Sequence, residues 1–111
     1  MVTDGGAPQE IPVLRPCGDM DHATVGSFAD ELQQLCAQHR AVIVDLAGVT
    51  FGDSTFLNTL IHAETRTDLR LTGVPDTIAR VFAITAMDEV LAIYPTCEAA
   101  QTAPPRSGDT A

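Results

Sequence analysis

The chain has 111 residues, 45% of them hydrophobic, and carries a formal net charge of −9 at pH 7. This size and composition fit one globular domain. The acidic balance argues against direct binding of nucleic acid, because neutralising phosphates requires basic patches. No apolar run approaches the roughly 20 residues that span a bilayer, and the N-terminus lacks the apolar stretch of a signal peptide. We therefore expect a cytoplasmic protein without direct membrane insertion.

In the first half of the chain, an arm is followed by a strand, a helix and a second strand. Residues 1–9 are rich in Gly and polar side chains, and we expect them to form a flexible arm. A short strand is predicted over 11–17, at an edge of the sheet because its prolines lack an N–H. Apolar residues then follow helical spacing over 25–39. Residues 41–46, AVIVDL, form the near-continuous apolar run of a strand buried on both sides.

The second half continues the alternation. A helix is predicted over 57–64, a strand over 68–74, a helix over 78–85 and a last short strand over 91–94. Residues 96–111 are rich in Pro, Thr, Gly and Ala, and we expect them to form a disordered tail. Strands that alternate with helices predict an α/β layer structure. In such folds, ligand and partner sites gather at the carboxyl ends of strands.

The sequence shows no sign of a metal or cofactor site. The three cysteines, Cys17, Cys36 and Cys97, are widely spaced and form no CxxC pair, so neither structural zinc nor a disulfide framework is indicated. EF-hand, HExxH, Walker and GxGxxG patterns are all missing. We expect reduced thiols, no metal and no cofactor.

The most informative stretch is VTFGDSTFLNTL, where Asp53, Ser54 and Thr55 interrupt an apolar pattern just before a helix. One of these side chains can cap the helix by accepting hydrogen bonds from its first amides. A nucleophilic serine would need a nearby base, and His62 lies eight residues further along the helix, about 12 Å away. No G-x-S-x-G elbow surrounds Ser54 either. We therefore expect no enzyme, but a hydroxyl that can be phosphorylated at a helix start, where the added charge is tolerated.

Three stretches of the sequence, CGDMDHAT, AVIVDLAGVTFGDST and VPDTIARVFAITAMDEVL, can be compared with known families as a set. Together they resemble the STAS domain of bacterial anti-sigma factor antagonists: the first matches the family's first turn, the second its buried strand and Asp-Ser-Ser/Thr switch, and the third its last helix and strand. They span residues 11 to about 95. The resemblance implies one STAS domain over 10–95, an α/β fold whose small mixed β-sheet has helices packed mainly on one side.

The resemblance also implies a function. The unphosphorylated family member binds an anti-sigma kinase and thereby frees a sigma factor. Phosphorylation of the serine that matches Ser54 blocks this binding, and a phosphatase restores it. We expect the partner surface to come from two neighbouring loops and the start of the following helix, with the residues Asp21, His22, Asp53, Thr55, Phe56 and Leu57.

Two departures from the family pattern leave an alternative open. Phe56 stands where the family has a glycine after Asp-Ser-Ser/Thr, and Ala86 replaces the glycine of a later Thr-Gly-Leu stretch. The alternative is an accessory STAS subunit of a transport ATPase or of a stress-signalling scaffold. In that case Ser54 is not phosphorylated, and Phe56 with Leu57 forms a packing surface.

Overall fold

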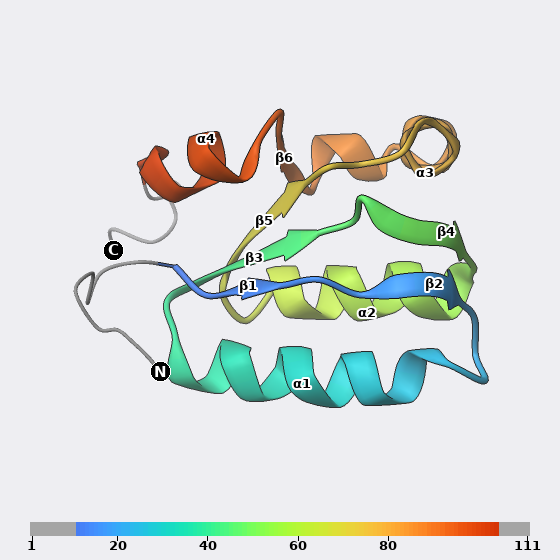
Figure 1. Cartoon of the computed structure of the whole chain (residues 1–111), viewed down its shortest axis with the longest axis horizontal. Helices are drawn as coiled ribbons and strands as arrows, with labels where there is room; N and C mark the ends of the chain where they lie inside the picture. The colour runs from blue at the N-terminus through green and yellow to red at the C-terminus, as the bar shows by residue number, and fades with distance from the viewer. Residues whose placement is uncertain (1–10, 105–111) are drawn as a thin grey trace.

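The computed structural model describes residues 11–104. The predicted alternation of strands and helices is present (Figure 1), with further strands at Cys17–Met20 and Gly48–Gly52 and a further helix at Cys97–Thr102. The predicted arm over 1–9 and the last part of the predicted tail, 105–111, lie outside the described residues. The elements, in chain order, are β1 (Val13–Leu14), β2 (Cys17–Met20), α1 (Val25–Gln38), β3 (Ala41–Asp45), β4 (Gly48–Gly52), α2 (Ser54–Glu64), β5 (Asp68–Thr72), α3 (Asp76–Ile84), the 3-10 helix η1 (Met87–Glu89), β6 (Ala92–Tyr94) and α4 (Cys97–Thr102).

Parallel pairing builds two sheets. Four strands form one sheet in the order β1-β3-β5-β6, and β2 pairs with β4 in a two-stranded sheet. Every strand pair within residues 11–104 is parallel, where a mixed sheet was expected. Val42, Ile43 and Val44 of β3 are 0% exposed between β1 and β5. This confirms the central strand predicted from the apolar run and the α/β class.

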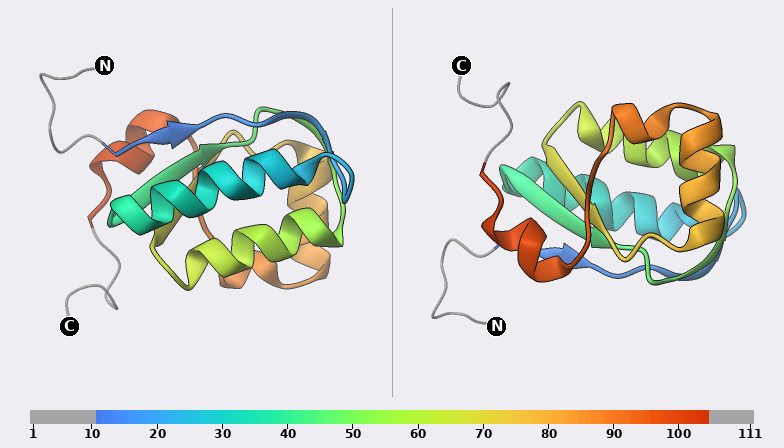
Figure 2. Two further views of the ribbon diagram at one scale, coloured as in Figure 1. Left: turned by 90° about the horizontal axis from the view of Figure 1, so that it is seen from below. Right: turned by 90° about the horizontal axis from the view of Figure 1, so that it is seen from above.

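Helices cover both faces of the sheet. The two longest, α1 and α2, lie side by side on one face and run in the same direction, while α3, η1 and α4 lie on the other (Figures 1 and 2). The long helices thus occupy one side, as expected, and the shorter ones close the second side. None of the helices in the described part of the chain combines the length and apolar character needed to cross a bilayer.

The C-terminal segment is ordered by a buried arginine, so the prediction of a disordered tail is wrong for α4. Arg70 of β5 is 2% exposed. Its Nη1 donates to the carbonyl oxygens of Ala100 at 2.6 Å and Ala103 at 2.8 Å, and its Nη2 donates to Asp68 Oδ2 at 2.7 Å. A guanidinium therefore meets the orphan carbonyls at the end of α4, where a helix favours positive charge. Local composition could not reveal this partner, because it lies 30 residues away.

Ala86 takes a left-handed conformation, with φ 62° and ψ 18°, just before η1. This conformation costs a residue with a Cβ about 1–2 kcal/mol. We expect Ala86→Gly to raise the free energy of unfolding by about 1 kcal/mol, measured by urea denaturation. Ala79→Gly, the same change at an exposed position inside α3, is the control and should lower stability by about 0.5–1 kcal/mol. A loss of stability in Ala86→Gly would contradict the strain at this residue.

Candidate functional site

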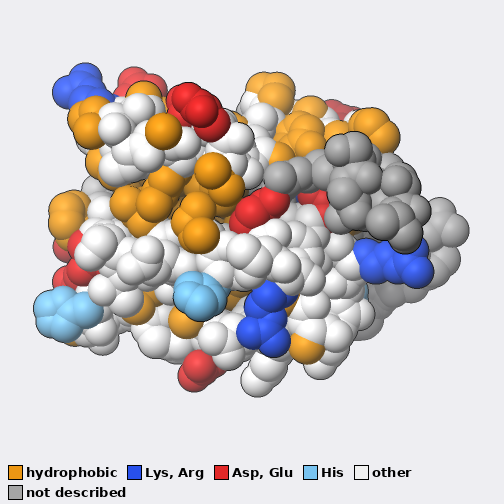
Figure 3. All heavy atoms as spheres, turned by 180° about the vertical axis from the view of Figure 1, so that it is seen from behind, with side chains coloured by type: hydrophobic (Ala, Val, Ile, Leu, Met, Phe, Trp, Pro, Cys, Tyr) orange, Lys and Arg blue, Asp and Glu red, His pale blue; other side chains and the backbone are white. Residues whose placement is uncertain are grey.

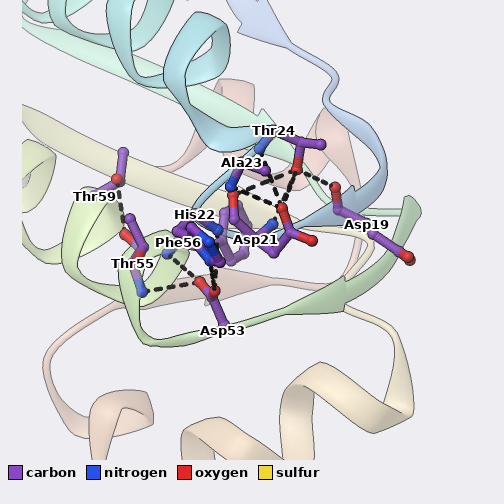
Figure 4. Close-up of polar contacts among 9 residues, drawn as sticks. All are labelled: Asp19, Asp21, His22, Ala23, Thr24, Asp53, Thr55, Phe56 and Thr59. Atoms are coloured by element: carbon purple, nitrogen blue, oxygen red, sulfur yellow. Dashed lines mark hydrogen bonds and ion pairs between the residues drawn. The ribbon is translucent and has the colours of Figure 1, made fainter.

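The candidate site lies where β2 and β4 end. The two strands are parallel, with Met20 opposite Gly52, so the chain segments that follow them meet at one edge of the molecule. The amide of Asp53 donates to the carbonyl oxygen of Met20 at 3.2 Å. The turn before α1 and the start of α2 therefore form one surface (Figure 4), although the hydrogen bond from His22 to Asp53 joins residues that are 31 positions apart in the sequence.

Asp53 caps α2 and ties it to the neighbouring turn. Its Oδ1 accepts hydrogen bonds from the amides of Thr55 at 2.9 Å and Phe56 at 3.2 Å. Its Oδ2 accepts from the amide of His22 at 3.1 Å. The predicted cap is thus confirmed, and it belongs to Asp53 rather than to Ser54 or Thr55. One carboxylate holds both loops of the site.

Asp21 organises the turn before α1. Its Oδ1 accepts from the amide of Ala23 at 2.9 Å and from the amide and hydroxyl of Thr24, both at 3.1 Å (Figure 4). The amide of Ala23, followed by the Thr24 hydroxyl, holds the pKa of Asp21 below its ordinary value of 3.8. These bonds favour the ionised carboxylate. Asp21 therefore presents a negative charge beside Asp53 at neutral pH.

The lowered pKa of Asp21 predicts how the free energy of unfolding changes with pH. Because the folded-state pKa of Asp21 is depressed, its contribution to stability is present above the ordinary value of 3.8 and is lost as the pH falls through the folded value. The difference in unfolding free energy between the wild type and Asp21→Asn should therefore narrow as the pH falls below 3.8. Urea denaturation across acidic pH measures it, with Asp30→Asn on α1 as the control. A difference that stayed constant across this range would contradict the assignment.

Ser54 is the first residue of α2, and its side chain is exposed. Thr55 is half-buried, and its carbonyl oxygen accepts from the Thr59 hydroxyl at 2.9 Å. His22 is 83% exposed, with Nδ1 3.9 Å from Asp53 Oδ2. The structure therefore brings Asp21, His22, Asp53, Ser54 and Thr55 to one surface, with Ser54 as its accessible hydroxyl.

Phe56 and Leu57 do not belong to that surface, which corrects the expectation that they touch a partner. Phe56 is 0% exposed and Leu57 is 7% exposed. The Phe56 ring lies 5.6 Å from the Phe28 ring, tilted by 40°. A Cβ at Gly52 would lie 2.5 Å from Phe56 Cδ2, so the glycine makes room for the ring. The aromatic residue that replaces the family glycine is a core residue that fills the space between α1 and α2.

Phe51, which the sequence did not single out, is the exposed aromatic residue next to the site, at 51% exposure. Strand alternation would place Phe51 on the same face as Val49, which is buried. The register between β2 and β4 shifts, however: Gly18 pairs with Val49 and Asp19 with Phe51, which leaves Thr50 as an extra residue. Such a bulge turns the following side chain outward. A bulge has no clear sequence signal, so the exposure of Phe51 could not be predicted.

Within residues 11–104, no group of three or more His, Cys, Asp or Glu side chains could hold a metal ion. Ser54 has no hydrogen bond to a histidine in the same part of the chain. The arrangement offers an exposed hydroxyl among ordered carboxylates, which suits recognition by another protein.

Comparison with known proteins agrees with this architecture. The family model described as "Mlab, STAS domain" matches residues 6–93. No curated protein matches the chain. An anti-sigma-factor antagonist (STAS) domain protein from Planctomyces limnophilus is 27% identical, with a TM-score of 0.66 over 75% of this chain and 77% of the other.

Two more distant solved structures share the fold. An anti-sigma factor antagonist from Mycobacterium paratuberculosis has a TM-score of 0.75 at 20% identity, covering 93% of this chain and 92% of the other. The anti-sigma factor antagonist SpoIIAA, in its unphosphorylated form, has a TM-score of 0.68 at 18% identity, covering 90% and 89%. The family match and the shared fold confirm the resemblance seen in the sequence, and the chain belongs to the STAS domain family.

Proposed function

We propose that the chain is a cytoplasmic anti-sigma factor antagonist that binds an anti-sigma kinase and is switched off by phosphorylation of Ser54. The observation that carries the proposal is the position of Ser54, exposed at the first residue of α2 and next to the capping Asp53. The similarity to proteins titled anti-sigma factor antagonists supports the same role.

The docking surface would consist of Asp21, His22, Asp53, Ser54 and Thr55. Hydrogen bonds between the two loops, from the amide of His22 to Asp53 and from the amide of Asp53 to the carbonyl oxygen of Met20, fix its backbone before a partner arrives, which lowers the entropy lost on binding. Asp21 and Asp53 make it acidic, so the partner should present basic groups here. Phe51 on β4 supplies exposed apolar area beside the acidic groups.

The switch would work through added charge. In the transfer, Ser54 Oγ bonds to the γ-phosphorus of ATP on the kinase, the bond to the bridging oxygen breaks, ADP leaves, and the hydroxyl proton passes to a base of the kinase. The phosphate brings about −1.5 to −2 charge. Asp53 already accepts hydrogen bonds from the amides of Thr55 and Phe56 at the start of α2. Because these amides are occupied, the phosphate would remain at the surface, facing the partner. A phosphatase would reverse the change by hydrolysis.

A second candidate is the accessory STAS subunit of a transport ATPase or a stress-signalling scaffold. The matching family model is described as "Mlab, STAS domain", without reference to sigma factors, which supports this candidate. Because Phe56 and Leu57 are buried, the packing surface of such a subunit would include Phe51 instead. Ser54 would then contribute an unmodified hydroxyl to a constant interface.

The two candidates differ in the partner captured from the host. Wild-type protein and Ser54→Asp would be immobilised in parallel, and captured proteins identified by mass spectrometry. Capture by the wild type alone of a kinase that phosphorylates Ser54 with ATP would support the switch. Capture of a transport ATPase or scaffold by both baits would overturn it in favour of the second candidate.

A further inference from the structure

A groove of about 280 Å³ lies between α1 and α2. From α1 it is lined by Ala29, Leu32, Gln33 and Cys36, and from α2 and the residues after it by Thr55, Asn58, Thr59, His62, Ala63 and Arg66. Filled with water at about 30 Å³ each, it would hold about nine molecules. This volume fits a small ligand with a similar number of non-hydrogen atoms.

The groove is elongated along α2. Its lining residues on the α2 side run from Thr55 to Arg66, which at 1.5 Å per residue is about 16 Å. Leu32, Cys36 and Ala63 form an apolar floor and are at most 8% exposed. A linear apolar chain fits this shape better than a compact ring.

The charge of the groove is opposite to that of the whole protein. The chain carries −9, yet the lining contains Arg66 and His62 and no acidic residue. None of the ion pairs found within residues 11–104 involves either side chain. Seen from behind, one Arg and one His side chain lie close together on the lower part of the molecule (Figure 3).

Arg66 is the charged side chain that acts on the interior of the groove. Burial raises the pKa of the Cys36 thiol, and the charge of Arg66 acts against that rise. Arg66 stands just after α2, at a helix end whose partial negative charge favours a positive side chain.

We propose that this groove binds a small linear amphipathic anion, with its alkyl chain between α1 and α2 and its carboxylate at Arg66 and His62. The site is separate from the proposed phosphorylation switch, although Thr55 at the far end of the groove adjoins Ser54. The proposal does not depend on phosphorylation or on the identity of the protein partner.

Octanoate is a suitable probe, titrated into isotope-labelled protein and followed by the NMR shifts of backbone amides. We expect saturable shifts confined to residues 29–36 and 55–66. Arg66→Glu should weaken octanoate binding by about tenfold or more, since it removes a charge-assisted contact and adds repulsion. Arg80→Glu, the same change at an exposed position on α3, should bind like the wild type.

Octylammonium, a cation with an alkyl chain of the same length, tests the sign of the charge and should bind much more weakly than octanoate. The proposal is overturned by equal affinity for the two probes, by equal octanoate affinity of Arg66→Glu and Arg80→Glu, or by shifts outside the groove. Absence of saturable octanoate binding would also overturn it. The NMR spectrum of each variant reports directly whether it is folded.

Discussion

Phe56→Ala is expected to lower the free energy of unfolding by about 3–5 kcal/mol, the range for removing a buried phenylalanine. The ring is 0% exposed, contacts Phe28 and occupies the space left by Gly52. Domains of this size unfold with about 5–15 kcal/mol, so the variant would lose a large part of its stability. Urea denaturation followed by circular dichroism measures the change.

Phe51→Ala is the matched control, because it removes the same side chain five residues earlier from a position that is 51% exposed. We expect it to change the unfolding free energy by less than about 1 kcal/mol. The contrast separates a core ring from a surface ring. If Phe56→Ala unfolded like the wild type but lost partner binding, Phe56 would be a contact residue and the core assignment would be wrong.

Ser54→Asp is expected to weaken binding of the captured kinase by about 100-fold or more, equivalent to about 2.7 kcal/mol. The partner's basic groups would face Asp21 and Asp53, so the new carboxylate is an additional charge with no group to pair with, and burying such a charge in an interface is costly. The fold should persist, because the first turn of a helix favours an acidic side chain. Ser54→Ala should bind as tightly as the unphosphorylated wild type and should not respond to ATP.

Ser27→Asp supplies the control for Ser54→Asp. Ser27 is exposed in the first turn of α1, as its third residue, so the substitution adds the same charge in the first turn of the other long helix. We expect it to bind normally. Calorimetric titration compares the three variants with the wild type, and equal affinities for Ser54→Asp and Ser27→Asp would rule out Ser54 as the switch.

Sequence periodicity predicted the elements that are regular over their length. Strand β3 is buried on both faces and helix α1 buries one face, and each burial pattern can be recognised from the spacing of the apolar residues. Strand β4 was missed because its five residues contain two glycines and a threonine left over at the bulge. Helix α4 was missed because it depends on Arg70, a partner distant in sequence.

The candidate site was predictable where chemistry is local. An aspartate before a helix is a cap in the sequence and in the structure, and Ser54 follows it at the exposed start of α2. Burial of the next residues was not predictable from this motif, since it depends on how α1 packs against α2. The sequence therefore predicted Phe56 to be a surface residue that replaces the family glycine, whereas its ring fills the space next to Gly52.

The most direct measurement is the intact mass of the protein purified from its own host, before and after phosphatase treatment. Trypsin cleavage after Arg40 and Arg66 places Ser54 on one peptide, residues 41–66, whose fragmentation locates the modified side chain. We expect a phosphatase-sensitive phosphate on Ser54 in part of the population, varying with growth conditions. An unmodified mass under all conditions, or a phosphate on another residue, would contradict the switch and leave Ser54 as part of a constant docking surface.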